Sequence, residues 1–218
     1  MLALMVEAAD DALLMTRYGI GDVPSFAPLY ARHKGPLYRY FVRQCGNAET
    51  ADELFQDVWL RLIKARERFE PRVPFTVYLY RIAHNCLVEH FRKSGRALTS
   101  ASDTGQFRVE EIREAVAEEI DPAFASGRWS LVEWDGDPAR GPGAALTGAE
   151  RTERLRMALE TLPMEQRETF LLREEAGMGL AEIAAVTGAN AEAVKSRLLN
   201  ALKTLRAAVG DLAPADSR

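Results

Sequence analysis

The strongest constraint on the fold is the spacing of apolar residues, which follows a helical repeat over two long stretches of the chain. The stretches cover residues 10–96 and 151–209, and glycine or proline marks the breaks within the first, as at Gly19, Gly46 and Pro74. Apolar residues at i, i+3, i+4 and i+7 indicate amphipathic helices. We find no alternating run of the kind that predicts a strand. The sequence therefore predicts an all-α fold.

Composition and charge divide this fold into two helical domains. Residues 97–150 are rich in Ser, Asp, Gly and Pro and carry a net charge of −7, against +6 for residues 26–96. This composition favours a long acidic linker with one short helix near Glu110–Ile120. Trp129 and Trp134 indicate that part of the linker docks on another surface. We expect the boundaries to be 1–96 (first domain), 97–150 (flexible linker), 151–210 (second domain) and 211–218 (tail).

Several function classes find no support in the sequence. No apolar run is long enough to span a membrane, and the acidic N-terminus does not resemble a secretory signal, so we expect a cytoplasmic protein. Cys86 and His90 have the i, i+4 spacing of two metal ligands, but chance placement explains a lone pair better. Without a phosphate-binding glycine loop or a paired nucleophile and base, we expect no enzymatic activity, no metal and no cofactor.

The helix predicted over residues 50–66 has two unlike faces. One face is a continuous apolar stripe, typical of a surface that packs on a core. The other is acidic and polar but contains two aliphatic side chains; we name it the docking face, and its residues are Asp52, Glu53, Gln56, Asp57, Leu60 and Ile63. Apolar residues ringed by acids indicate a protein interface. An ordinary surface with two stray aliphatic residues is the alternative.

The helix that starts near Phe75 combines an apolar stripe with a polar one. Tyr78, Arg81, Asn85 and Arg92 align on one side, and the preceding loop adds Arg68, Phe69 and Arg72. Aromatic, amide and guanidinium groups together can stack on bases, bond to base edges and neutralise phosphates, as single-strand recognition requires. A solvated helix face is the alternative.

The C-terminal stretch predicts a helix-turn-helix. A helix between Pro163 and Gly177 precedes a short helix closed by Gly188, and Asn190 can cap the longer helix that follows. The outward side of that last helix, here the groove face, carries Glu192, Lys195, Ser196, Leu199, Asn200 and Lys203. Lys, Ser and Asn side chains can contact bases and phosphates in a DNA major groove. A helical hairpin used only for packing is the alternative.

Three stretches of the sequence resemble sigma factors of bacterial RNA polymerase, of the short extracytoplasmic-function (ECF) type. Two of these stretches are similar to sigma domain 2: FAPLYARHKGPLYRYF followed by ADELFQDVWLRLIKARERF, and PFTVYLYRIAHNCLVEHFRKSGR. The segment from LRMALETLPMEQRETF to NALKTLR is similar to sigma domain 4. The resemblance implies a promoter-specificity subunit that binds core polymerase, recognises two promoter elements and promotes DNA opening.

The resemblance also implies partners for each surface. The docking face would bind the clamp helices of the beta-prime subunit, and the segment 162–178 would contact the beta flap. The groove face would read the minus-thirty-five duplex. The non-template single strand of the minus-ten element would be bound by a strand-binding face, which comprises Arg68, Phe69, Arg72, Phe75, Tyr78, Arg81, Asn85 and Arg92. An anti-sigma factor is expected as a further partner. The resemblance implies that the acidic linker threads toward the polymerase channels, and a solvated, disordered tether is the alternative.

Two features depart from the usual pattern of these factors. The family usually has a tryptophan where Tyr78 stands and often a basic residue where His84 and Asn200 stand, so promoter preference does not transfer from a relative. The linker is also long for this type. The alternative function is a helix-turn-helix regulator that binds duplex DNA without core polymerase, but it leaves the docking and strand-binding faces without a role.

Overall fold

The computed structural model describes residues 10–95 and 148–209, and within these ranges the chain is helical, with no strand. The predicted all-α class is confirmed. The expected linker helix, Trp129, Trp134 and the tail lie outside the described residues. In chain order the elements are α2 (Asp11–Gly19), η1 (Val23–Ser25), α3 (Phe26–Cys45), α4 (Ala48–Ala65), η2 (Arg66–Arg68), α5 (Phe75–Lys93), α8 (Gly148–Thr161), α9 (Met164–Ala176), α10 (Leu180–Thr187) and α11 (Ala191–Val209).

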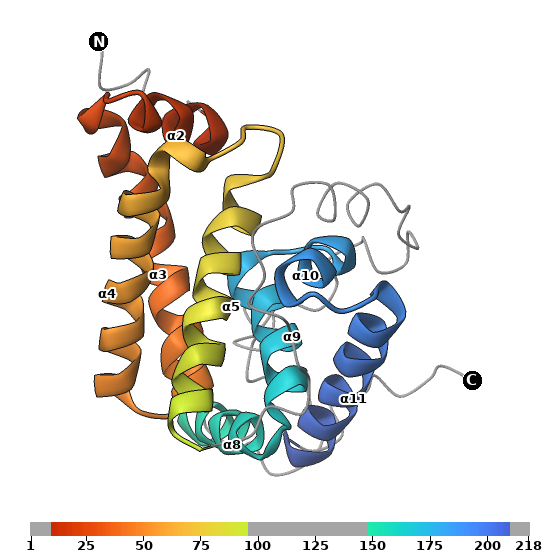
Figure 1. Ribbon diagram of the computed structural model, residues 1–218. Coiled ribbons are helices and arrows are strands. Elements are labelled where there is room, and N and C mark those ends of the chain that lie inside the picture. The colour runs from red at the N-terminus through yellow and green to blue at the C-terminus, as the bar shows by residue number, and fades with distance from the viewer. Residues whose placement is uncertain (1–9, 96–147, 210–218) are drawn as a thin grey trace.

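The helices form two groups that lie against each other. In the first, α3, α4 and α5 run side by side and α2 crosses one end of them (Figure 1). In the second, α11 packs with α8, α9 and α10. The groups meet where α9 contacts α3 and α10 contacts α5. Segments more than 80 residues apart in the sequence, such as His84 and Glu168, are therefore neighbours in space.

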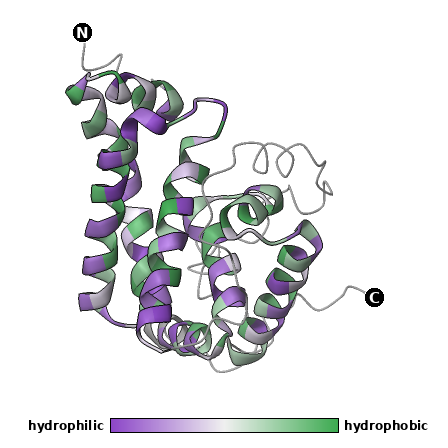
Figure 2. Cartoon of the chain, viewed as in Figure 1, coloured by the Kyte–Doolittle hydropathy of each residue, from purple (hydrophilic) through white to green (hydrophobic). Residues whose placement is uncertain are grey.

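Aromatic side chains join α3 to α4. Phe26 and Tyr30 of α3 meet Trp59 of α4 with ring centroids 5.7 and 4.9 Å apart, in edge-on arrangements. Such pairs bury a large apolar area and add a favourable edge-to-face interaction. The apolar stripe predicted for α4 is confirmed, since Ala51, Leu54, Val58 and Leu62 are buried and Phe55 is half-buried. The docking face consequently lies on the opposite side of α4, where the hydrophilic residues gather (Figure 2).

The short helix α2 is fixed by polar contacts and a close backbone approach. Asp11 binds Arg32 at 2.5 Å and His33 at 2.6 Å, both on α3. At the other end of α2, a Cβ on Gly19 would lie 2.9 Å from the Arg66 carbonyl oxygen, closer than side-chain carbons approach backbone atoms. Glycine at this position therefore allows α2 to pack on η2.

The predicted helix-turn-helix is confirmed in its local structure. Gly188 ends α10 with φ of 69°, in the left-handed region that glycine adopts without strain, and its N–H bonds to the Ala184 carbonyl. The Asn190 side chain then accepts a hydrogen bond of 2.7 Å from the Ala193 N–H, as predicted for a cap of α11. Val194, Leu198, Ala201 and Leu205 of α11 are buried, and Leu202 is half-buried.

The apolar cores of the two groups are continuous. Buried side chains from α3 and α5 belong to the same hydrophobic cluster as those from α9, α10 and α11. Among the described residues, no helix is long and apolar enough to cross a membrane. Helix faces that pack on this shared core are buried, and the predicted surfaces are exposed to solvent only where no other part of the chain packs on them.

Candidate nucleic-acid interface

The groove face of α11 lies open to solvent. Glu192, Ser196, Leu199, Asn200 and Lys203 are exposed, and Lys195 is half-buried. Leu199 keeps 48% of its surface exposed, whereas the adjacent Leu198 keeps 3%. An ion pair of 2.8 Å between Arg197 and Glu165 links α11 to α9 on the inner side. The helix therefore presents a polar surface that also contains the exposed Leu199, and the ion pair fixes its orientation.

The docking face of α4 is also open, with one exception. Asp52, Glu53 and Gln56 are exposed, and Leu60 keeps 54% of its surface exposed. Asp57 is partly exposed and pairs with Arg61 at 2.8 Å. Ile63 differs from the prediction, because it is half-buried against the hydrophobic core. Leu60 is therefore the large exposed apolar side chain within this face.

Arg61 connects the docking face to α5. Its guanidinium donates two hydrogen bonds, of 3.2 and 2.8 Å, to the Glu89 carboxylate. These bonds hold the pKa of Glu89 below its usual range, so the carboxylate stays ionised near neutral pH. The fork geometry of arginine suits such two-point pairing and fixes the register of α4 against α5.

The strand-binding face differs most from its prediction, because two of its aromatic residues point inward. Tyr78 keeps 5% of its surface exposed and Phe75 keeps 2%. Their rings pack on Phe69, with centroids 5.2 and 6.3 Å away, and the Tyr78 hydroxyl donates to the Ala65 carbonyl at 3.2 Å. Burial raises the pKa of Tyr78. The helical wheel placed Tyr78 on the outer side because it could not show that the preceding loop folds back over this part of α5.

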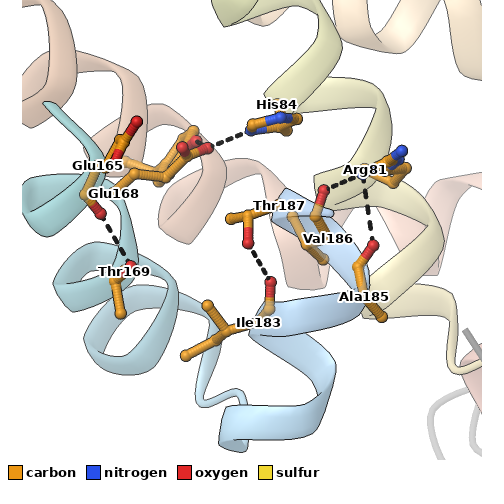
Figure 3. A network of polar contacts seen from close by, with 10 residues as sticks. Arg81, His84, Glu165, Glu168, Thr169, Ile183, Ala185, Val186 and Thr187 are labelled. Carbon is orange, nitrogen blue, oxygen red and sulfur yellow. Dashed lines mark hydrogen bonds and ion pairs between the residues drawn. The ribbon is translucent and has the colours of Figure 1, made fainter. Parts of the chain in front are cut away.

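The arginines of the strand-binding face are either exposed to solvent or bonded to the second helical group. Arg68, Arg72 and Arg92 are exposed, and Phe69 and Asn85 are half-buried. Arg81 instead points at the second helical group, where its Nη1 donates to the carbonyls of Val186 at 2.5 Å and Ala185 at 3.4 Å (Figure 3). Both carbonyls belong to the last turn of α10. The structure therefore engages Arg81 with α10, whereas the other three arginines are exposed.

A buried polar cluster that the sequence analysis did not identify lies beside Arg81. The Glu168 carboxylate of α9 lies 2.7 Å from His84 Nδ1 of α5 (Figure 3). The same carboxylate accepts a hydrogen bond of 2.8 Å from the Tyr40 hydroxyl of α3. All three residues are buried. Glu168 stands 128 residues from Tyr40 and 84 residues from His84 in sequence, and no spacing rule connects them. We find no signal in one sequence that could have revealed the cluster.

The groups of this cluster stabilise one ionisation state of Glu168 and Tyr40. Burial alone would raise the pKa of Glu168, but the neighbouring His84 and the hydrogen bonds from His84 and Tyr40 outweigh it and lower that pKa. Burial and the negative charge of Glu168 raise the pKa of Tyr40 well above its ordinary value. The stable arrangement is thus an ionised Glu168 that accepts a hydrogen bond from a neutral Tyr40.

The described residues offer no alternative site for metal chemistry. They contain no group of three or more His, Cys, Asp and Glu side chains that could hold a metal ion. Cys45 and Cys86 are both free thiols. Burial raises the pKa of Cys86 to about 12, so its thiol stays protonated and unreactive at neutral pH.

Comparison with known proteins matches the two helical groups separately. Residues 29–97 match the family model of Sigma-70 region 2, and residues 152–205 match that of Sigma-70, region 4. The ECF RNA polymerase sigma factor SigD of Mycobacterium tuberculosis is 30% identical over 185 residues, which are 81% of this chain and 74% of SigD. The chain belongs to the ECF family of RNA polymerase sigma factors.

Other relatives of this ECF sigma factor carry the same family name or a related one. The RNA polymerase sigma factor CarQ of Myxococcus xanthus is 27% identical over 91% of this chain and 97% of CarQ. The ECF sigma factor SigE of Mycolicibacterium smegmatis is 28% identical over 84% of this chain, and the match spans 61% of SigE. The chain thus covers about three fifths of the length of SigE and nearly all of CarQ.

Solved structures show the same fold. CnrH in complex with the cytosolic domain of CnrY has 22% identity and a TM-score of 0.58, and the match covers 90% of this chain and 95% of that chain. The sigma factor RpoE in complex with the anti-sigma factor NepR from Bartonella quintana has 19% identity and a TM-score of 0.58, with coverage of 86% and 98%. At these identities the likeness establishes the fold alone.

Proposed function

We propose that this ECF sigma factor directs transcription initiation by binding core RNA polymerase, reading two promoter elements and promoting DNA opening. In this proposal, residues 1–96 bind core polymerase and the minus-ten element, and residues 151–210 read the minus-thirty-five element. The acidic linker over 97–150 joins them. The protein has no catalytic chemistry of its own in this role and supplies specificity to the polymerase.

The observation that carries the proposal is the docking face of α4. Leu60 is exposed on a helix whose neighbouring surface residues are acidic or polar, among them Asp52, Gln56 and Asp57. An exposed aliphatic side chain within a charged rim is typical of the centre of a protein interface. We propose the beta-prime clamp helices as its partner and assign the beta flap to the segment 162–178.

The two DNA-binding roles are assigned to separate helices. On α11, Lys195, Ser196 and Asn200 can enter the major groove, with Lys203 positioned for phosphate. In the loop before α5, Arg68 and Arg72 are exposed next to the aromatic Phe69. A flipped base of the non-template strand requires such a combination of charge and stacking surface, since unstacking a base costs a few kcal/mol.

An anti-sigma factor is the further partner that we propose. The neighbours CnrH and RpoE were both solved in complexes, with CnrY and with the anti-sigma factor NepR. The exposed docking face and groove face are the surfaces through which an inhibitor could block polymerase and DNA at once.

Run-off transcription on a promoter library, with core polymerase alone and with the protein added, tests the function. We expect specific initiation at sites that share two spaced elements. The Leu60→Arg variant should abolish both polymerase binding and specific initiation, because it places a charge at the centre of the interface, and its circular dichroism spectrum should stay helical.

Two results would contradict the proposal. If core polymerase gains no specificity while the protein alone shifts duplex DNA in a gel, the helix-turn-helix regulator becomes the better account. If Leu60→Arg binds polymerase normally, the docking face is not the interface. Glu153→Arg, a charge reversal at an exposed position of α8, is the matched control and should leave polymerase binding unchanged.

A further inference from the structure

The docking face of α4 has its exposed leucine in the middle and one acid toward each side. With 3.6 residues per turn, Asp52 stands about 80° to one side of Leu60, and Asp57 stands about 60° to the other side. The helix itself packs on both α3 and α5. Each of the two acids is bonded by a residue of this chain, and the two sets of bonds come from different sides of α4.

Asp57 is held from the side of α5. Arg61, one turn further along α4, contacts the Asp57 carboxylate at 2.8 Å. The same guanidinium is fixed in turn by its two hydrogen bonds to Glu89 of α5. An exposed ion pair usually contributes little to folding. Because the Asp57 side chain keeps 42% of its surface exposed, its carboxylate is oriented and still open to a partner.

Asp52 is held from the side of α3. The Tyr38 hydroxyl is hydrogen-bonded to Asp52, and this bond raises the pKa of Tyr38, so the hydroxyl stays neutral and donates. The Tyr38 ring is itself placed by an edge-on contact with Phe55 of α4, at 5.7 Å between centroids. Asp52 is exposed, so it too is oriented and accessible at once.

The other polar residues of the docking face have no such support. Glu53 and Gln56 are exposed, and neither forms a hydrogen bond or an ion pair within the part of the chain that the structure describes. A side chain that is already held loses less conformational freedom when an interface forms than one that is not. Asp52 and Asp57 are therefore the preorganised charges of this face.

We propose that Tyr38 and Arg61 are positioning residues for polymerase binding, which hold Asp52 and Asp57 on the two sides of Leu60, where each acid meets a cationic side chain of the partner. The inference rests on the proposed function. A carboxylate has about four acceptor sites, so each acid keeps its internal bond while it accepts from Lys or Arg. The partner surface that fits is apolar in the middle, with a cation on either side.

The first test removes the guanidinium and keeps most of the aliphatic stem, in the variant Arg61→Met. This change removes a positive charge beside Asp57, so charge alone predicts tighter binding to a cationic partner, whereas lost positioning predicts weaker binding. We expect the dissociation constant for core RNA polymerase to rise about fivefold. Arg156→Met is the matched control, since Arg156 also bridges two carboxylates, on α8, and it should leave binding unchanged.

The second test changes no charge at all. Tyr38→Phe removes the hydroxyl that bonds to Asp52 and should raise the dissociation constant about threefold, the range of one hydrogen bond. Tyr30→Phe is the matched control, because the Tyr30 ring also contacts Phe55 edge-on. It should bind core polymerase as the wild type does.

Double variants distinguish positioning from a general structural role. If Arg61 acts through Asp57, Arg61→Met should cause no further weakening in a chain that carries Asp57→Asn. Tyr38→Phe should likewise cause none in a chain that carries Asp52→Asn. Circular dichroism should stay helical in every variant. Losses that multiply in both backgrounds would overturn the inference, because the two residues would then act independently of the acids.

One readout needs no polymerase. Arg61 holds the pKa of Glu89 below its usual range, and an NMR titration of the free protein should show that pKa rising in Arg61→Met. An unchanged pKa would contradict the inference. A wild-type protein that fails to bind core polymerase would reject the proposed function and this inference with it. Wild-type binding with unchanged dissociation constants in Arg61→Met and Tyr38→Phe would reject the inference alone.

Discussion

The outer side of α11 and the corresponding side of α5 carry similar kinds of residues and have different surroundings. Lys203, Asn200 and Ser196 on α11 are exposed, whereas Arg81 on α5 caps α10 and Tyr78 is buried under its own loop. Polar and aromatic residues in helical register therefore do not by themselves identify an open surface. What decides exposure is whether another part of the chain packs there.

Two adjacent leucines of α11 give the largest expected contrast. Leu198→Ala removes a buried side chain and should lower the free energy of unfolding by about 2 to 5 kcal/mol, as cavities in cores do. Leu199→Ala, on the groove face, should change it by no more than about 0.5 kcal/mol and should weaken duplex binding. Urea unfolding and duplex titration measure both effects. Equal destabilisation by the two variants would place Leu199 in the core.

The lysines of α11 and Arg81 of α5 should differ in the free protein. Lys195→Ala combined with Lys203→Ala should weaken duplex binding and reduce the slope of log affinity against log salt by about 1 for each phosphate that is no longer neutralised. Arg81→Ala should leave that slope unchanged, because its guanidinium is engaged with α10. Titrations of a minus-thirty-five duplex at several salt concentrations provide the test. A reduced slope in Arg81→Ala would show that α5 already reaches DNA.

The side of α5 that faces α4 should show a pH effect. Burial raises the pKa of Cys86 to about 12, and an unfolded cysteine titrates near 8.5. Between these values only the unfolded state releases the proton, so stability falls as pH rises, by at most about 1.4 kcal/mol per pH unit from this group. Cys86→Ala should unfold with a shallower dependence on pH above 9 in urea titrations. Parallel wild-type and variant curves would contradict the burial of the thiol.

Tyr78 gives the smallest expected change. Tyr78→Phe removes the hydroxyl that donates to the Ala65 carbonyl and should lower the free energy of unfolding by about 1 kcal/mol. Single-strand binding should be unchanged, since the ring lies against Phe69. Weakened strand binding at unchanged stability would instead assign the hydroxyl to DNA.

Helical periodicity and capping residues were enough to predict the fold class and the helix-turn-helix. Pro163, Gly177 and Asn190 mark the ends of helices because their effects are local: a fixed φ, a left-handed residue and a short polar side chain. The outward side of α11 was also predicted, since the exposure of an amphipathic helix follows its wheel.

The contact between the two groups could not be predicted in the same way. Glu168 stands in a helix with several other acids, and nothing local distinguishes it from a solvated glutamate until His84 and Tyr40 are brought beside it. Ile63 and Tyr78 were misplaced for a related reason, because a wheel describes one helix and contains no information about the loops and helices that pack on it. Tertiary contacts over long sequence separations account for each of these differences.

The most direct test of the contrast between α11 and α5 is the binding of the free wild-type protein to two probes taken from one promoter recovered in the run-off assay. One probe is the minus-thirty-five duplex and the other is the non-template single strand of the minus-ten element. We predict that the duplex binds at protein concentrations at which the single strand remains free. Single-strand binding as tight as duplex binding would contradict the account, because it would show that α5 is open in the free protein.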